Sequence, residues 1–266
     1  MQRTPTNIDG DAQFGQSVST DGDLLVVGAP NDRENDGSAF IYQRTETTWV
    51  QVAKLAPEDP ENIKEFGHEV IMRGNIVAVA DNLYGGKAKG AVFVYRYSSD
   101  LLQWGLIDII INHGCVGKFG DSLDITNGTD LVIGCPLDDG KNGAVYFYKQ
   151  KDGDGKYSFR QKITPQDGEG FAHIEFGRHL AVDRKFMAVG TNEKLNGKVY
   201  LFTLDDDDVW KQVAKIPTPS SNHTRFGRSI RLAEDNLLIS HRENVYAYKL
   251  LCPGTAPNEN LFLVYP

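Results

Sequence analysis

Two acidic segments hold the residues best suited to binding a metal ion. Asp152-Gly-Asp-Gly155 places two carboxylates at alternate positions, as calcium-binding loops do. Such a loop also needs a third oxygen ligand and a later glutamate, but Lys156 and Tyr157 come next. The second segment, Asp205 to Asp208, is a run of like charges, which usually stays in solvent. We therefore predict two hairpin turns, and neither a metal nor another cofactor.

The histidines do not suggest a metal site or a catalytic site. They lack the spacing of known zinc motifs. His68 and His179 lie near the starts of two predicted strands, two and three residues after a phenylalanine. Strand alternation points such side chains to opposite faces. The sequence also lacks a GxSxG elbow, a P-loop and a GxGxxG that follows a strand. We predict that the chain is not an enzyme.

Two other residue types could undergo covalent modification. Cys115 stands just before a Phe-Gly dipeptide, and Cys135 ends the second strand predicted after it. The start of one strand and the end of the next meet at the same end of a hairpin. The geometry therefore allows a disulfide, and two reduced thiols are the alternative. Asn127 and Asn222 begin Asn-x-Thr sequons and are candidate N-glycosylation sites.

Composition and charge exclude several classes of protein. The 266 residues are enough for one domain with its own core. A net charge of −8 disfavours binding to nucleic acid and to anionic membranes. The longest apolar run, residues 106–112, has the length of a strand rather than that of a membrane span. We predict no nucleic-acid partner and no membrane insertion.

A Phe-Gly dipeptide recurs five times, at spacings of 52, 53, 57 and 50 residues. The phenylalanines are Phe14, Phe66, Phe119, Phe176 and Phe226. After each dipeptide come an alternating run, a tight polar turn, and an apolar run that ends in small residues. A polar loop and an aromatic-alternating run follow, such as AVFVYRY and KVYLFTL. Four repeats add a further strand opened by Trp49, Trp104, Phe159 or Trp210.

Four short antiparallel strands in each of five repeats predict an all-β fold, a five-bladed β-propeller. We expect one domain over residues 1–266. Glycine allows the first strands to approach one another near the axis, and the phenylalanine can wedge between blades. The fifth repeat lacks an adjacent fourth strand. Because QRTP near the N-terminus resembles the ends of other fourth strands, we predict that the N-terminal segment completes this blade and closes the ring. The alternative is LFLVYP at 261–266.

These residues resemble the FG-GAP repeat of integrin α subunits and many surface proteins. Phe-Gly is kept five times, and Gly-Ala-Pro is intact at Gly28-Ala29-Pro30. The resemblance implies a propeller with an interaction or adhesion role at a cell surface, outside the cell or in an organelle lumen. Calcium-binding members carry an acidic loop between the first two strands. Here those turns are too short and too poor in oxygen ligands, so we expect no calcium dependence of that kind.

The long loops connect second strands to third strands and one blade to the next, so they share one face of the propeller. We call it the long-loop face. Loops on a rigid scaffold usually carry recognition. We predict a protein partner here, with Arg33, Tyr84 and Phe171 as anchors, which would make the chain a subunit of a larger assembly. A lectin with a glycan ligand is the first alternative, and an enzyme site in the central channel is the second.

Overall fold

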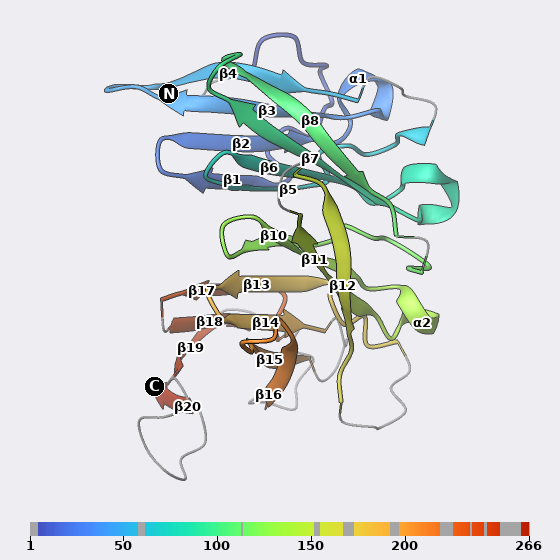
Figure 1. Cartoon of the computed structure of the whole chain (residues 1–266), viewed down its shortest axis with the longest axis vertical. Coiled ribbons are helices and arrows are strands. Elements are labelled where there is room, and N and C mark those ends of the chain that lie inside the picture. Colours follow the sequence, from blue (N-terminus) through green and yellow to red (C-terminus); the bar gives the residue numbers. More distant parts are fainter. Residues whose placement is uncertain are drawn as a thin grey trace.

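The structure is a computed structural model, and it describes most of the chain. The described residues are 5–57, 62–112, 114–151, 155–166, 173–191, 197–218, 226–234, 236–241, 244–250 and 262–265. They form a β-propeller of five blades, and each blade is a sheet of four strands that follow one another as in the chain. Figure 1 shows the blades in chain order, from the first (blue) to the fifth (red). The predicted fold class is confirmed.

The strands are short and pair only with antiparallel neighbours. The first blade contains β1 (Val18–Asp21), β2 (Leu24–Ala29), β3 (Ser38–Arg44) and β4 (Trp49–Leu55). The second contains β5 (Glu69–Arg73), β6 (Ile76–Asp81), β7 (Ala91–Ser98) and β8 (Gln103–Ile110). The third contains β9 (Leu123–Thr126), β10 (Asp130–Cys135), β11 (Ala144–Gln150) and β12 (Tyr157–Ile163).

The last two blades have the same plan. The fourth contains β13 (His179–Asp183), β14 (Phe186–Gly190), β15 (Lys198–Leu204) and β16 (Trp210–Pro217). The fifth contains β17 (Ile230–Ala233), β18 (Asn236–His241), β19 (Asn244–Leu250) and β20 (Phe262–Tyr265). The first strands of successive blades contact one another, so they are the inner strands. Short helical turns, α1 (Asp32–Asn35), Tyr84–Ala88 and α2 (Asp138–Lys141), lie in three of the long loops.

A bulge recurs between the third and fourth strands. The register shifts at the same place in the first four blades, at Ile41/Tyr42, Val94/Tyr95, Phe147/Tyr148 and Leu201/Phe202. A bulge bends a strand and increases its twist. The fourth strands of these four blades therefore turn away from the inner ones in the same way.

The hydrophobic core lies between blades rather than within them. One cluster fills the space between each pair of successive blades, and residues of both blades contribute to it. In the cluster between the first two blades, Phe66 is buried beside the ring of Phe93, at 5.2 Å between ring centroids. A single blade could not bury its two apolar faces alone, so each blade depends on its neighbours.

The Phe-Gly dipeptides place the backbones of neighbouring blades in direct contact. The Phe66 amide donates to the Asp36 carbonyl, and Phe176 donates to the Asn142 carbonyl, at 3.2 and 2.9 Å. The residue after each acceptor is a glycine. A Cβ on Gly143 would lie 2.1 Å from the Phe176 carbonyl oxygen, which only glycine avoids. The recurring small residues are therefore required by contacts between blades.

The predicted closure by the N-terminal segment is wrong for the described residues. The fourth position of the fifth blade belongs to β20, which pairs with β19, so Phe262–Tyr265 of the alternative segment takes this place. Residues 5–13 lie along the first blade instead, where the Thr6 amide donates to Gln51 Oε1 and Lys54 Nζ donates to the Asn7 carbonyl. Residues 1–4 lie outside the described part of the chain.

The structure joins Cys115 and Cys135 by a disulfide, with 6.4 Å between their Cα atoms. Cys115 belongs to the connection between the second and third blades, and Cys135 ends β10. The bond closes a loop of about 20 residues. It therefore ties this connection to the blade that follows.

Substitution of Gly143 by alanine tests the contact between blades. We expect a loss of more than about 4 kcal/mol in the free energy of unfolding, because the new Cβ would collide with the Phe176 backbone. Gly128→Ala is the matched control, since Gly128 also has a positive φ but nothing lies within 4 Å of its Cβ. It should lose only about 1–2 kcal/mol. If denaturant titrations showed the same loss of free energy of unfolding for both variants, the collision would be contradicted.

Reduction tests the disulfide. In the chain-entropy treatment, opening a loop of this length lowers the free energy of unfolding by about 3 kcal/mol. We expect dithiothreitol to lower the thermal midpoint of the wild type and to leave that of Cys115→Ala/Cys135→Ala unchanged. A wild type whose Cys115 and Cys135 both react with a thiol reagent after native purification would show that the bond does not form.

Candidate functional site

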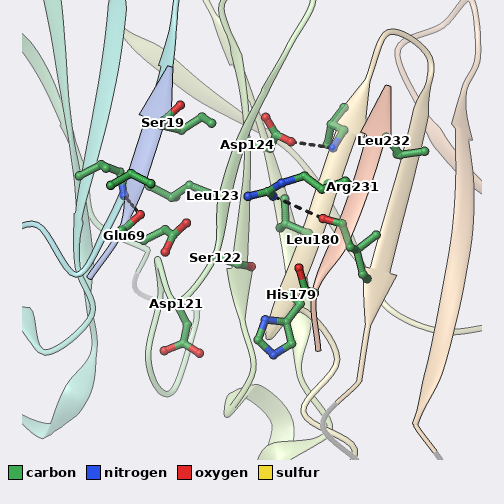
Figure 2. A pocket seen from close by; sticks show the side chains of 18 of the residues that line it. Ser19, Glu69, Asp121, Ser122, Leu123, Asp124, His179, Leu180, Arg231 and Leu232 are labelled. Carbon is green, nitrogen blue, oxygen red and sulfur yellow. Dashed lines mark hydrogen bonds between the residues drawn. The ribbon is translucent and has the colours of Figure 1, made fainter. Parts of the chain in front are cut away.

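The inner strands of all five blades line a central channel with a volume of about 670 Å³. Figure 2 shows its wall, where Ser19, Glu69, Asp124 and Arg231 come from four different blades. An inner strand is a sheet edge, so part of its backbone lacks a partner within the blade. Side chains of the preceding blade supply partners: Ser17 Oγ accepts from the Val70 amide at 3.1 Å. The channel is therefore lined with polar groups that join the blades.

This pattern repeats along the channel. Ser19 Oγ accepts from the Met72 amide at 3.1 Å, and Asp124 Oδ2 accepts from the Val182 amide at 2.7 Å (Figure 2). In both cases the acceptor stands five residues after the phenylalanine of its repeat. The polar alternation of the first strands thus has a structural role.

A second set of polar contacts crosses four blades at the end of the channel near the Phe-Gly dipeptides. Gln16 Nε2 lies 3.1 Å from His68 Nδ1, and His68 Nε2 lies 3.6 Å from Asp121 Oδ1. Asp121 Oδ2 lies 3.9 Å from Arg178 Nη1. Each of the four residues stands two positions after a phenylalanine. Burial alone would raise the pKa of Asp121, but His68 and the charge of Arg178 outweigh it and hold the pKa below its usual value.

Two titratable groups in the channel have pKa values far from their usual ones. Burial raises the pKa of Glu69 to about 7, against the opposing effects of His68, Ser17 and Arg231. Burial lowers the pKa of His179 to about 4, and the positive charge of Arg178 lowers it further. At neutral pH the His179 ring is therefore uncharged, and Glu69 is close to half protonated.

The channel does gather titratable groups, which is what the enzyme alternative requires. The acids Glu69, Asp121 and Asp124 come from the second and third blades, whereas Arg178, Arg228 and Arg231 come from the fourth and fifth. Arg73 of the second blade lines the channel too, and its Nη2 lies 3.6 Å from Asp124 Oδ1, so both signs of charge occur on the acidic side. Within the described residues, no three His, Cys, Asp or Glu side chains are grouped so that they could hold a metal ion.

Two loops on the long-loop face share a rare backbone conformation. Arg33, Glu34 and Asn35 in α1 have φ values of 55°, 58° and 78°. Asp139, Gly140 and Lys141 in α2 have values of 46°, 67° and 77°. Three successive left-handed residues are costly when they are not glycine, so the surrounding structure must hold them.

A buried aspartate precedes each of these turns and holds it in place. Asp32 Oδ2 lies 2.7 Å from Lys54 Nζ, which lies 5.1 Å from the centroid of the Phe40 ring. Asp138 repeats the arrangement with Lys162 at 2.7 Å, and the Tyr146 hydroxyl donates to it at 2.6 Å.

Both aspartates stay ionised at neutral pH. Burial would raise the pKa of Asp32 and of Asp138, but hydrogen bonds from the lysines prevail and lower it. Sequence reasoning missed these two pairs. A repeated pattern in the sequence could have revealed them. Both aspartates stand four residues after the glycine of Gly-Ala-Pro or Gly-Cys-Pro, and both lysines directly precede the last apolar residue of a fourth strand.

The structure separates the predicted anchors. Arg33 lies in the exposed α1 turn, where Nη1 is 3.5 Å from the Pro57 carbonyl oxygen and Nη2 is 3.9 Å from Asp36 Oδ2. Tyr84 is half-buried, and its ring packs against Phe93 at 5.9 Å between centroids. Phe171 lies outside the described residues. Arg33 is thus half-buried beside the backbone of residue 57, and Tyr84 contributes to the core.

The remaining candidates lie elsewhere. Asn127 is exposed in the turn between β9 and β10, at the end opposite the long loops. Asn222 and residues 152–154 lie outside the described part of the chain. Asp205 caps its own hairpin by accepting from the Asp207 and Val209 amides, as a turn does.

Comparison with known proteins agrees with this architecture. Residues 4–42 match the model of the FG-GAP repeat. The matched residues contain the first three strands of the first blade, in a chain that forms a propeller of five blades. The FG-GAP match includes Phe14-Gly15 and Gly28-Ala29-Pro30. No curated protein matches the chain by sequence.

Solved structures share the fold at low sequence identity. A protein from Lactobacillus plantarum superposes with a TM-score of 0.64 and 17% identity, over 95% of this chain and 70% of that one. Sqt1 of Saccharomyces cerevisiae gives 0.49 and 12%, over 91% and 84%. The first of these similarities supports the fold alone.

Substitution of Glu69 by glutamine tests the protonation of the channel. In the folded protein the Glu69 carboxyl stays protonated up to about pH 7, whereas its usual pKa is 4.5. The free energy of unfolding of the wild type therefore falls as the pH rises between these two values. Because glutamine does not ionise, the variant Glu69→Gln should not lose this stability as the pH rises. We expect the variant to be more stable than the wild type by roughly 2 kcal/mol at pH 8 and equally stable at pH 4.

Denaturant titrations at pH 4, 6 and 8 measure this difference. A variant that is less stable than the wild type at pH 8 would show that Glu69 is ionised and stabilising in the channel.

Proposed function

We propose that this propeller is a non-catalytic protein-binding module whose partner docks on the long-loop face. One observation carries the proposal: the turns α1 and α2 are held in a left-handed conformation by the buried pairs Asp32–Lys54 and Asp138–Lys162, while their tips stay exposed. A loop that is ordered before binding loses less conformational entropy when it binds. Backbone strain of this kind tends to be kept where it serves a function.

A protein partner fits these turns better than a repeated sugar site does. Both turns are held by the same kind of buried aspartate–lysine pair. Their tips differ, however, and are Arg33-Glu34-Asn35 in the first blade and Asp139-Gly140-Lys141 in the third. Equivalent sugar sites would need the same side chains in each blade. Different side chains on the same rigid support favour one continuous surface with a single protein ligand.

The disulfide and the exposed Asn127 sequon support an extracellular or luminal setting for this function. Disulfides persist in oxidising compartments, and sequons are modified in the secretory pathway. Of the helices in the described ranges, none is long and apolar enough to cross a membrane.

Peptide selection with reversed loop charges tests the proposal. A random displayed peptide library is selected on the wild type, and the selected peptides are titrated against Glu34→Lys/Lys141→Glu. Both residues are exposed tips, so the fold should be kept. We expect the affinity to fall by about tenfold or more, because the contacts lie on this face.

The control is Arg184→Glu/Lys185→Glu, which reverses two exposed charges in the turn between β13 and β14 on the opposite face. Arg184 is also left-handed, with a φ of 54°. The control should change the affinity by less than about twofold. Two results would refute a protein-binding long-loop face: selected peptides that bind Glu34→Lys/Lys141→Glu as tightly as the wild type, or binding that is found only on a glycan array.

A further inference from the structure

A polar side chain of one blade binds the fourth strand of the next blade at two interfaces. Asp108 of β8 accepts from the Tyr157 amide at 2.7 Å, across the interface between the second and third blades. Gln161 of β12 bridges the third and fourth blades, where its Oε1 accepts from the Trp210 amide at 2.8 Å and its Nε2 donates to the Trp210 carbonyl at 3.0 Å. Tyr157 and Trp210 begin their strands, and each is at most 9% exposed. The bridging side chain therefore covers the start of a fourth strand.

The interface between the first two blades lacks this bridge. Ala53 of β4 stands beside the bulge at the position that Gln161 has in β12, and its methyl group has no polar atom. Trp104 of β8 takes the place of Trp210, but it is only half-buried. Ala53 and Trp104 both line a pocket of about 640 Å³ between β4 and β8 (Figure 1), which we call the β4–β8 pocket. Its volume is typical of small-molecule sites, which measure roughly 300–1,000 Å³.

The walls of the β4–β8 pocket combine apolar side chains with neutral amides. Val52 and Leu102 are 49% and 76% exposed, and both line the pocket. The rings of Tyr97 and Trp104 lie beside each other there, at 5.5 Å between centroids. Three carboxamide side chains complete the lining, those of Gln43, Asn75 and Gln103. A matching ligand therefore has an apolar body and a neutral polar group.

The charges around the pocket disfavour an anionic ligand. Of the described residues that line it, only Lys54 is charged at neutral pH. Lys54 Nζ already lies 2.7 Å from Asp32 Oδ2 and 5.1 Å from the centroid of the Phe40 ring. A carboxylate in the pocket would lose its water without gaining a free cation, which is costly. A carboxamide can make the same hydrogen bonds without this cost.

The backbone of Trp104 is oriented like that of Trp210. Trp104 pairs with Tyr97 at the register position where Trp210 pairs with Leu204, so the amide and carbonyl of both tryptophans face the same side of their strands. At Trp210 these two groups bind the carboxamide of Gln161. The equivalent groups of Trp104 are therefore suited to a carboxamide that comes from outside the chain.

We infer that the β4–β8 pocket binds an uncharged small molecule that joins a carboxamide to an apolar ring. The carboxamide accepts from the Trp104 amide and donates to its carbonyl, while the ring packs against Val52 and Leu102. Gly74 and Asn75, in the turn between β5 and β6, also line the pocket, which places it at the end opposite the long-loop face. This site is thus separate from the surface proposed for a protein partner.

A pair of probes that differ only in charge tests the inference. Naphthalene-2-carboxamide and naphthalene-2-carboxylate are titrated into the wild type, and the backbone amide signal of Trp104 is followed by NMR. We expect the carboxamide to shift this signal and to bind at least about tenfold more tightly than the carboxylate, because the carboxylate finds no free cation in the pocket.

The variant Ala53→Gln supplies the bridging side chain from within the chain. It should weaken binding of the carboxamide by at least about tenfold, because glutamine occupies the same place. It should also slow hydrogen exchange of the Trp104 amide by at least about tenfold, as a new hydrogen bond protects it. Val50→Gln is the matched control, since Val50 is an exposed residue of the same strand outside the pocket lining. It should change neither quantity.

Four results would overturn the inference. Three of them are a Trp104 signal that the carboxamide does not shift at millimolar concentration, equal affinity for the two probes, and binding that Ala53→Gln leaves unchanged. The fourth is a capped Gln-Phe dipeptide that binds at least about tenfold more tightly than naphthalene-2-carboxamide. It would identify a side chain of a partner protein, rather than a small molecule, as the source of the carboxamide.

Discussion

The backbone of each incoming Phe-Gly dipeptide comes so close to the preceding blade that a side chain cannot lie between them. Three phenylalanine amides donate to the carbonyl just before the receiving glycine, from Phe66 to Asp36, from Phe119 to Lys89 and from Phe176 to Asn142. This contact fixes the distance and the angle between blades. It allows the clusters between the blades to bury their side chains, and it brings the inner strands together around the channel.

The channel and the long-loop face both follow from this packing. Inner strands held at this distance expose backbone groups that the preceding blade can reach, and Ser17, Ser19 and Asp124 satisfy them. Many of the channel's polar groups thus bind the backbone of a neighbouring blade. Their gathering in the channel is therefore explained by structure and does not by itself indicate catalysis. The long loops leave from the glycine-rich ends of the second strands. There the buried aspartates Asp32 and Asp138 hold two turns in a left-handed conformation.

Much of this architecture could be predicted from the sequence. The spacing of Phe14, Phe66, Phe119, Phe176 and Phe226 predicts five blades, since the same contact must recur once in each. The closing strand of the fifth blade could not be decided, because QRTP and LFLVYP both have strand-like ends and only the pairing with β19 separates them. Tyr84 was predicted as an exposed anchor because it lies in a long loop, but its ring turns back onto Phe93.

The importance of the Gly37 position could not be predicted, because it depends on an interatomic distance, which no alternation pattern contains. The same holds for the disulfide, which hairpin geometry allowed but could not decide.

Hydrogen exchange at the phenylalanine amides tests the central contact most directly. The amides of Phe66, Phe119 and Phe176 cross between blades, so they should exchange only through global unfolding. The amide of Phe14, whose side chain is 37% exposed in the first blade, should exchange far faster. Equal protection of Phe14 and the other three would contradict the account, because it would mean that the first blade is covered in solution as the others are.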